Sequence, residues 1–189
     1  MKKIIVILLC LFSYFAYAKD TVNLKEIKTQ VIKGDARNAG VIINLTNKGP
    51  DLWFCVDDLG NTSSQNDVFR VLLQVAAKLK NQEYEQIILC HHRKTEFLLS
   101  GKNFSKIGHE FGKQNVLYTL RTFPEKLRLA DGSKAFSRHQ GGVLYVMNQQ
   151  MKDFKIVNLD WYLSDILRTR QAEKDIKRPK SFAKDEDVF

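Results

Sequence analysis

Residues 66–80 read Asn-Asp-Val-Phe-Arg-Val-Leu-Leu-Gln-Val-Ala-Ala-Lys-Leu-Lys, and this stretch decides the fold. Apolar residues recur in it at steps of three and four, which predicts an amphipathic helix with one face on a core. The polar run 61–66 predicts the preceding loop, in which Ser64 or Asn66 accepts the first free backbone NH groups. The apolar positions of the helix are Val68, Val71, Leu72, Val75, Ala76 and Leu79.

Four short apolar runs flank this helix and predict a sheet. The first pair is separated by Asn47-Lys48-Gly49-Pro50, in which Gly and Pro indicate a turn. The second pair forms a predicted hairpin, because the polar residues 91–94 between its arms supply the chain reversal. The runs are 41–45 and 52–56 before the helix, and 86–90 and 95–99 after it.

Residues beyond the hairpin predict one more helix and one more strand. Residues 103–111 predict a short helix with apolar residues on one side, which Gly112 ends. Residues 116–123 alternate in polarity as far as Pro124, which cannot donate to a sheet ladder. We therefore expect residues 116–123 to form the fifth strand.

The last strong helix is expected from Gly142 onward, after a loop at 130–142 that is rich in Gly and Ser. Residues 161–167 either continue this helix or begin another, and residues 22–33 are compatible with a strand or a helix. The apolar residues that define the last helix stand one turn apart: Val143, Met147, Met151 and Phe154.

Together these segments predict a single α+β domain at residues 19–170. Its mixed sheet of about five strands is covered on at least one face by the helices at 66–80 and 142–167, because a sheet must bury its apolar face against another layer. From Arg168 onward charged residues dominate and few side chains can be buried. We therefore expect residues 171–189 to form a charged, mobile tail.

The first eighteen residues have the pattern of a cleavable bacterial signal peptide. Lys2 and Lys3 precede the apolar run 4–12, and Ala16-Tyr17-Ala18 supplies small residues where signal peptidase cleaves. A membrane anchor is the rival interpretation, but the run is shorter than the roughly 20 apolar residues needed to cross a bilayer. We expect cleavage after Ala18 and a periplasmic or secreted protein. No later stretch of the mature chain is long and apolar enough to span a membrane.

The predicted mature chain is basic and keeps two cysteines. Loss of Lys2 and Lys3 lowers the formal charge from +9 to +7. Cys55 and Cys90 lie in apolar runs, and in an oxidising compartment such a pair predicts a disulfide worth about 3–4 kcal/mol. Two buried free thiols are the alternative. We expect no metal site or cofactor, because no second pair of ligands stands close to either cysteine.

Asp57 and Asp58 are the first candidates for chemistry. They follow the buried run 52–56, at the position where open α/β sheets place catalytic or metal-binding acids. Adjacent carboxylates suit a hard cation such as magnesium or calcium. However, consecutive strand residues point to opposite faces, and acids also end strands simply because they are soluble.

The second candidate is an anion site at the start of the last helix. Residues 137–142 read Ser-Arg-His-Gln-Gly-Gly, and free backbone NH groups at a helix start favour an anion. Arg138 and His139 would add charge and donors, Gly141 and Gly142 would allow close approach, and Arg121 would join them if the fold permits. The alternative is a plain flexible loop.

These features lead to three functional hypotheses. The first is an exported, non-enzymatic binding protein, because no assembled catalytic motif appears in the sequence. The second is a hydrolase for an anionic substrate, with Asp57 or Asp58 as metal ligand or base, His139 as acid or base, and Arg121 and Arg138 holding the anion. The third is an immunity or inhibitor protein. Basic residues are spread along the chain, so we expect a protein or an anionic envelope component as partner rather than nucleic acid.

Overall fold

The computed structural model describes residues 22–177 of the 189-residue chain. The predicted signal peptide (1–18) and the end of the predicted tail (178–189) lie outside the described residues.

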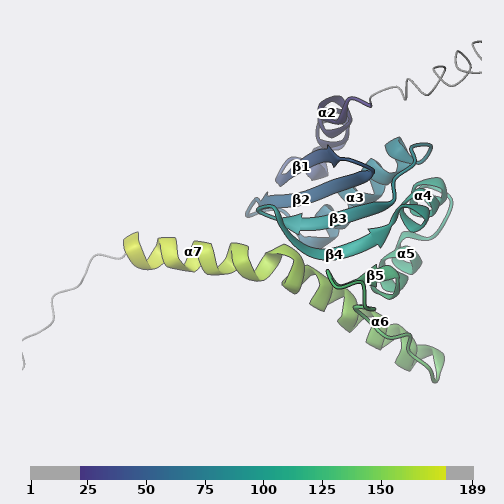
Figure 1. The fold of residues 1–189 in the computed structure, drawn as a ribbon. Coiled ribbons are helices and arrows are strands. Elements are labelled where there is room, and N and C mark those ends of the chain that lie inside the picture. Colours follow the sequence, from purple (N-terminus) through teal and green to yellow (C-terminus); the bar gives the residue numbers. More distant parts are fainter. Residues whose placement is uncertain (1–21, 178–189) are drawn as a thin grey trace, which may run out of the picture.

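A mixed five-stranded sheet forms the centre of the domain, with the strands in sequence order from β1 to β5 (Figure 1). β2 and β3 are parallel, and every other neighbouring pair is antiparallel. The predicted α+β fold is confirmed. The strands are β1 (Val41–Lys48), β2 (Asp51–Leu59), β3 (Gln86–His91), β4 (Lys94–Ser100) and β5 (Leu127–Arg128).

Helix α3 (Gln65–Leu79) connects the two parallel strands and covers one face of the sheet, as the period of 66–80 predicts. Its first turn is fixed by a capping box in which Ser64 and Asp67 bond each other's backbone NH groups. Two further helices flank it, α2 (Leu24–Gly34) and α4 (Gly101–Glu110). Figure 1 shows α3 behind the sheet, whereas no helix covers the face turned to the viewer.

The C-terminal part forms one long helical rod, whose middle turn contacts β2, β3 and β4 (Figure 1). It consists of α6 (Val143–Asn158), a π-helical turn η3 (Leu159–Leu163) and α7 (Ser164–Lys177). Trp161 and Tyr162 of the π-helical turn are both buried, and the Trp161 ring lies 5.7 Å from the ring of Phe54. Residues 161–167 therefore continue the helix that begins at Val143.

The expectation of a fifth strand at 116–123 is wrong. These residues form helix α5 (Val116–Thr122), which the Asn115 side chain caps by accepting from the Leu117 NH group at 2.8 Å. The alternating residues Val116 and Tyr118 are half exposed, while the buried positions are adjacent in α5, Thr119 and Leu120. The fifth strand is β5, only two residues long, and it follows a 3-10 turn, η2 (Pro124–Lys126).

Both ends of the described chain are more helical than the sequence predicts. Residues 22–33, compatible with either element, lie mostly in α2, whose first turn the Asn23 side chain caps. Residues 171–177, expected to belong to an irregular tail, continue α7. Arg170 of α7 contacts the end of β2, because its guanidinium donates hydrogen bonds to the Leu59 carbonyl and to Asp58.

Candidate functional site

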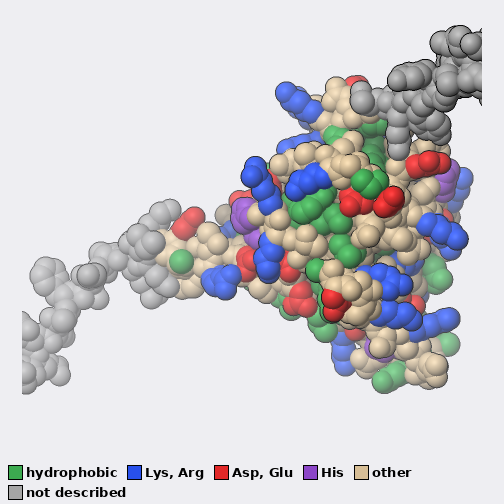
Figure 2. Space-filling view, in the orientation of Figure 1, with side chains coloured by type: hydrophobic (Ala, Val, Ile, Leu, Met, Phe, Trp, Pro, Cys, Tyr) green, Lys and Arg blue, Asp and Glu red, His purple; other side chains and the backbone are tan. Residues whose placement is uncertain are grey.

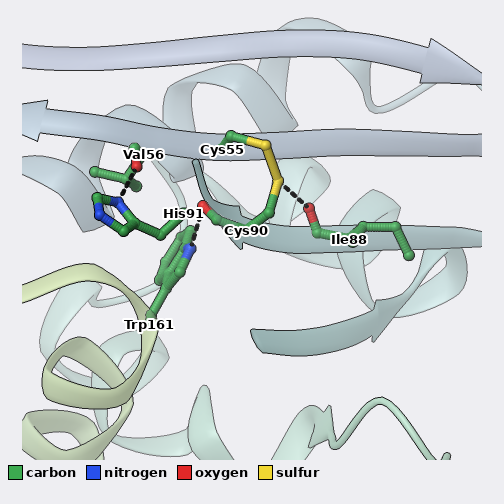
Figure 3. Close-up of a disulfide and its surroundings, with 6 residues drawn as sticks. All are labelled: Cys55, Val56, Ile88, Cys90, His91 and Trp161. Carbon is green, nitrogen blue, oxygen red and sulfur yellow. Dashed lines mark hydrogen bonds between the residues drawn. A yellow bond between two sulfur atoms is a disulfide. The ribbon is translucent and has the colours of Figure 1, made fainter. Parts of the chain in front are cut away.

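Cys55 and Cys90 face each other across the parallel strands β2 and β3 (Figure 3). Their sulfur atoms lie 1.97 Å apart, at disulfide distance, and both residues are buried. Trp161 donates from Nε1 to the Cys90 carbonyl at 2.9 Å, which joins the C-terminal rod to the same point of the sheet. A disulfide here leaves neither sulfur free to act as a thiolate nucleophile.

Asp57 lines a hollow of about 610 Å³ on the uncovered face of the sheet. Trp53 and Cys55 precede it on the same face of β2, and Lys48 of β1 places Nζ 3.4 Å from the centre of the Trp53 ring. His92 closes one side of the hollow. The walls therefore combine one aromatic ring with charges of both signs.

His92 and Arg93 form the two-residue turn between β3 and β4, and both have positive φ angles, of 45° and 69°. This turn normally takes Asn-Gly, since side chains other than those of Gly, Asn and Asp cost roughly 1–2 kcal/mol each in that conformation. Both residues line the hollow beside Asp57. The turn was predicted one residue longer at each end, at 91–94.

Asp58 follows Asp57 at a β-bulge, where the pairing of β2 with β1 shifts register and leaves Asp57 without a partner in β1. Its carboxylate lies 3.0 Å from the Arg170 guanidinium and accepts from the Leu59 NH group. Asp58 lines a separate hollow formed with α7. The two carboxylates line different hollows, and the side chains that the structure describes include no cluster of three His, Cys, Asp or Glu that suits a metal ion.

The residues of the predicted anion site lie on α5, in the loop before α6 and at the start of α6. His139 Nε2 lies 2.6 Å from the Asp153 carboxylate of α6, an ion pair when the imidazole is protonated. Gly142 is the N-cap residue of α6, and Gly141 before it has a φ of 133°. Arg138 is exposed in the same loop.

Arg121 lies on α5, which packs against α6. Its Nε is buried and makes no hydrogen bond with the described residues. Figure 1 shows α5 and the start of α6 at the lower right, whereas β2 ends at the left beside α7. The fold therefore separates Asp57 and Asp58 from the group around His139.

The most prominent surface at that end is apolar. We call it the α5–α6 surface, and it consists of six large side chains on two touching helices, all of them about half exposed or more. Val143 and Leu144 are 75% and 76% exposed. The full set is Val116, Leu117 and Tyr118 on α5 and Val143, Leu144 and Tyr145 on α6.

This surface exists because α6 begins beyond the edge of the core. The first buried residue of the helix is Gln150, followed by Phe154, so the two turns before Gln150 contain no buried residue, although Val146 and Met147 are partly covered. The sequence pattern predicts Val143 on the same buried helix face as Phe154, and it predicts a strand at 116–123. Both predictions place residues of this surface in the core. One local signal was available: three consecutive apolar residues at 143–145 cannot all face one side of a helix.

Comparisons of the chain with protein-family models, with curated proteins and with solved structures found no match.

Proposed function

We propose that this chain is an exported, non-enzymatic binding protein that attaches to a component of the cell envelope through the α5–α6 surface. The observation that carries the proposal is the exposure of six large apolar side chains on two adjacent helices. Single exposed apolar residues are common on folded proteins, but large exposed apolar areas mark sites of interaction, and here three consecutive apolar residues are exposed on each of two helices in contact.

The predicted export signal and the cysteine pair support the location. Disulfides persist in oxidising compartments such as the periplasm or the medium, and Cys55 and Cys90 lie at disulfide distance. Within residues 22–177, no helix is both long enough and apolar enough to cross a bilayer. An attachment through an exposed surface fits these observations.

The hydrolase hypothesis receives less support from the geometry. Its residues fall into two groups at opposite ends of the domain (Figure 1). Asp58 is already paired with Arg170, and His139 with Asp153. An immunity or inhibitor role is one form of the binding proposal, in which the partner is a protein.

The test uses a photo-reactive amino acid placed at position 144 of the full chain in the organism that makes it. Position 167 is the matched control, because Leu167 is also a helical leucine and is 52% exposed, but lies on α7. We expect a covalent adduct from position 144 and none from position 167. Absence of an adduct at 144, or equal adducts at both positions, would contradict the proposal.

A further inference from the structure

We infer that the partner at the α5–α6 surface is an anionic lipid surface, on which the protein sits peripherally with the start of α6 inserted. This inference rests on the proposed function and names its partner. Three observations carry it: the distribution of apolar residues around the helix, the shape of this end of the molecule, and its charge.

The exposed apolar residues at the start of α6 cover a wider part of the helix than a single stripe. Successive helical residues are rotated by about 100°, so Val143, Leu144 and Tyr145 span about 200° of the circumference. A helix that docks in the groove of a protein partner uses one face, with anchors at steps of three and four. Apolar side chains over more than half the circumference fit immersion in a medium that is apolar on all sides.

The start of α6 also projects far enough to insert. The turns before the first buried residue, Gln150, comprise residues 143–149, which rise about 10 Å along the helix axis. Interfacial helices bury their apolar side chains to a depth of about 5–10 Å in the boundary between headgroups and acyl chains. Tyr118 and Tyr145 add amphipathic rings of the kind enriched at this boundary.

The surrounding segment is strongly basic. Residues 111–147 contain six Lys and Arg against two acids, a net charge of +4, whereas the predicted mature chain as a whole carries +7. Three of these charged residues contact the protein: Glu125 accepts a hydrogen bond from Gln150 at 2.7 Å, Lys126 donates to the Thr122 carbonyl, and the Nε of Arg121 is buried. The basic residues that remain are all exposed: Lys113, Arg128, Lys134 and Arg138. Figure 2 shows green side chains at this end of the molecule with blue Lys and Arg side chains beside them.

Charge and apolarity together favour lipid over a protein partner. Exposed basic residues near an anionic membrane each strengthen binding about fivefold. Lys134 and Arg138 are exposed in the loop that leads into α6, and Arg138 precedes Val143 by five residues, so the chain keeps it within about 18 Å. Insertion of the helix start would therefore bring basic side chains to the lipid phosphates.

The experiment measures binding of the full mature chain to vesicles. One set contains phosphatidylglycerol and phosphatidylethanolamine, and the other contains phosphatidylcholine alone. We expect binding to the first set, weakened by salt, and little binding to the second. Leu144→Asp should weaken binding at least tenfold, because a charge replaces a side chain that is buried in the bilayer boundary, and Leu167→Asp should have no effect.

The charge contribution is tested with two double variants of equal charge change. Lys134→Gln with Arg138→Gln should weaken binding about twenty-five-fold. Lys25→Gln with Lys33→Gln, which alters exposed residues of α2 at the other side of the domain, should leave it within about twofold. All these sites are exposed, and far-UV circular dichroism checks that each variant is folded.

Failure of the inference is distinguishable from failure of the proposed function. If the protein does not bind anionic vesicles but position 144 forms an adduct with a protein in cells, the lipid inference is overturned and the binding function stands. If neither vesicle binding nor an adduct occurs, both are overturned. Equal binding to both vesicle sets, or equal weakening by the two double variants, would also refute the charge argument.

Discussion

Reduction of the Cys55–Cys90 disulfide should destabilise the folded domain by about 4 kcal/mol. The two cysteines are separated by 35 residues. Closing a loop of that length removes about 13 cal/mol/K of entropy from the unfolded chain, which corresponds to about 4 kcal/mol at 25 °C on the loop-closure model. The folded state loses little on reduction, because the ladder between β2 and β3 still holds Cys55 opposite Cys90.

The assay is urea unfolding of the purified mature protein, oxidised and reduced. With a slope near 2 kcal/mol per molar urea, the midpoint should fall by about 2 M on reduction. Mass spectrometry of each sample gives the redox state, since reduction adds two hydrogen atoms. A Cys55→Ala/Cys90→Ala variant should be at least as unstable as the reduced protein, because it also loses buried sulfur atoms.

Two results would refute this reasoning. A change below about 1 kcal/mol with the bond demonstrably reduced would show that loop closure does not set the stability difference. Two free thiols in protein purified from its native compartment would contradict the argument from an oxidising environment.

Two further substitutions test how the domain is held together. Asp67→Ala removes the capping box of α3 and should lower the free energy of unfolding by about 1 kcal/mol in urea titration. Desolvation raises the pKa of Asp67, but hydrogen bonds from Ser64 and Arg70 outweigh it and hold the pKa below its ordinary value. The stabilisation by ionised Asp67 is therefore fully present above the ordinary carboxyl pKa, and it is lost as the pH falls through the lowered pKa of Asp67. If the wild type were still more stable than Asp67→Ala in strong acid, this explanation would be refuted. Trp161→Phe removes the hydrogen bond to the Cys90 carbonyl and some buried volume, so it should lower the free energy of unfolding by about 2–3 kcal/mol. The control, Trp53→Phe on the uncovered face, should lower it by less than about 1 kcal/mol. Equal losses of stability in the two variants would contradict the role of the Trp161 hydrogen bond.

The elements that local pattern decides were predictable from the sequence. The helix at 66–80 is found as α3, and the hairpin arms 86–90 and 95–99 are found as β3 and β4. Their buried residues follow the period of a helix or a strand that is packed along its whole length. The pairing of Cys55 with Cys90 was predictable because only two cysteines remain after the predicted cleavage.

The elements whose exposure depends on tertiary structure were not predictable in this way. Residues 116–123 alternate in polarity, but of the alternating apolar side chains Val116 and Tyr118 are half exposed and only Leu120 is buried, so the pattern does not mark a buried strand face. Val143 lies in register with Phe154, yet only the folded domain shows that the core ends near Gln150. The α5–α6 surface arises because α5 leaves residues 116–118 exposed and because α6 begins two turns before its first buried residue.

For the candidate site residues too, local geometry was predictable, whereas partners on distant elements were not. Strand geometry predicts that consecutive residues such as Asp57 and Asp58 point to opposite faces, but a β-bulge at Asp57 interrupts that alternation, and the two carboxylates line different hollows. The pairing of Asp58 with Arg170 does not follow from the sequence, because it joins residues 112 positions apart and Arg170 lies in no predicted helix or strand. The sequence places His139 in a candidate anion site, but it does not predict the partner of His139, which is Asp153 of the next helix.

Hydrogen exchange at the start of α6 tests the central claim most directly. The amides of Val143, Leu144 and Tyr145 precede the first backbone bond of the helix, Val146 NH to the Gly142 carbonyl, so they lack intrahelical partners and exchange quickly in the free protein. Short exchange times are compared with and without washed envelopes from the organism that makes the protein. We predict slower exchange in residues 143–149 and in α5, with α7 unchanged. Unchanged exchange at 143–149, or protection centred on another surface, would contradict the account.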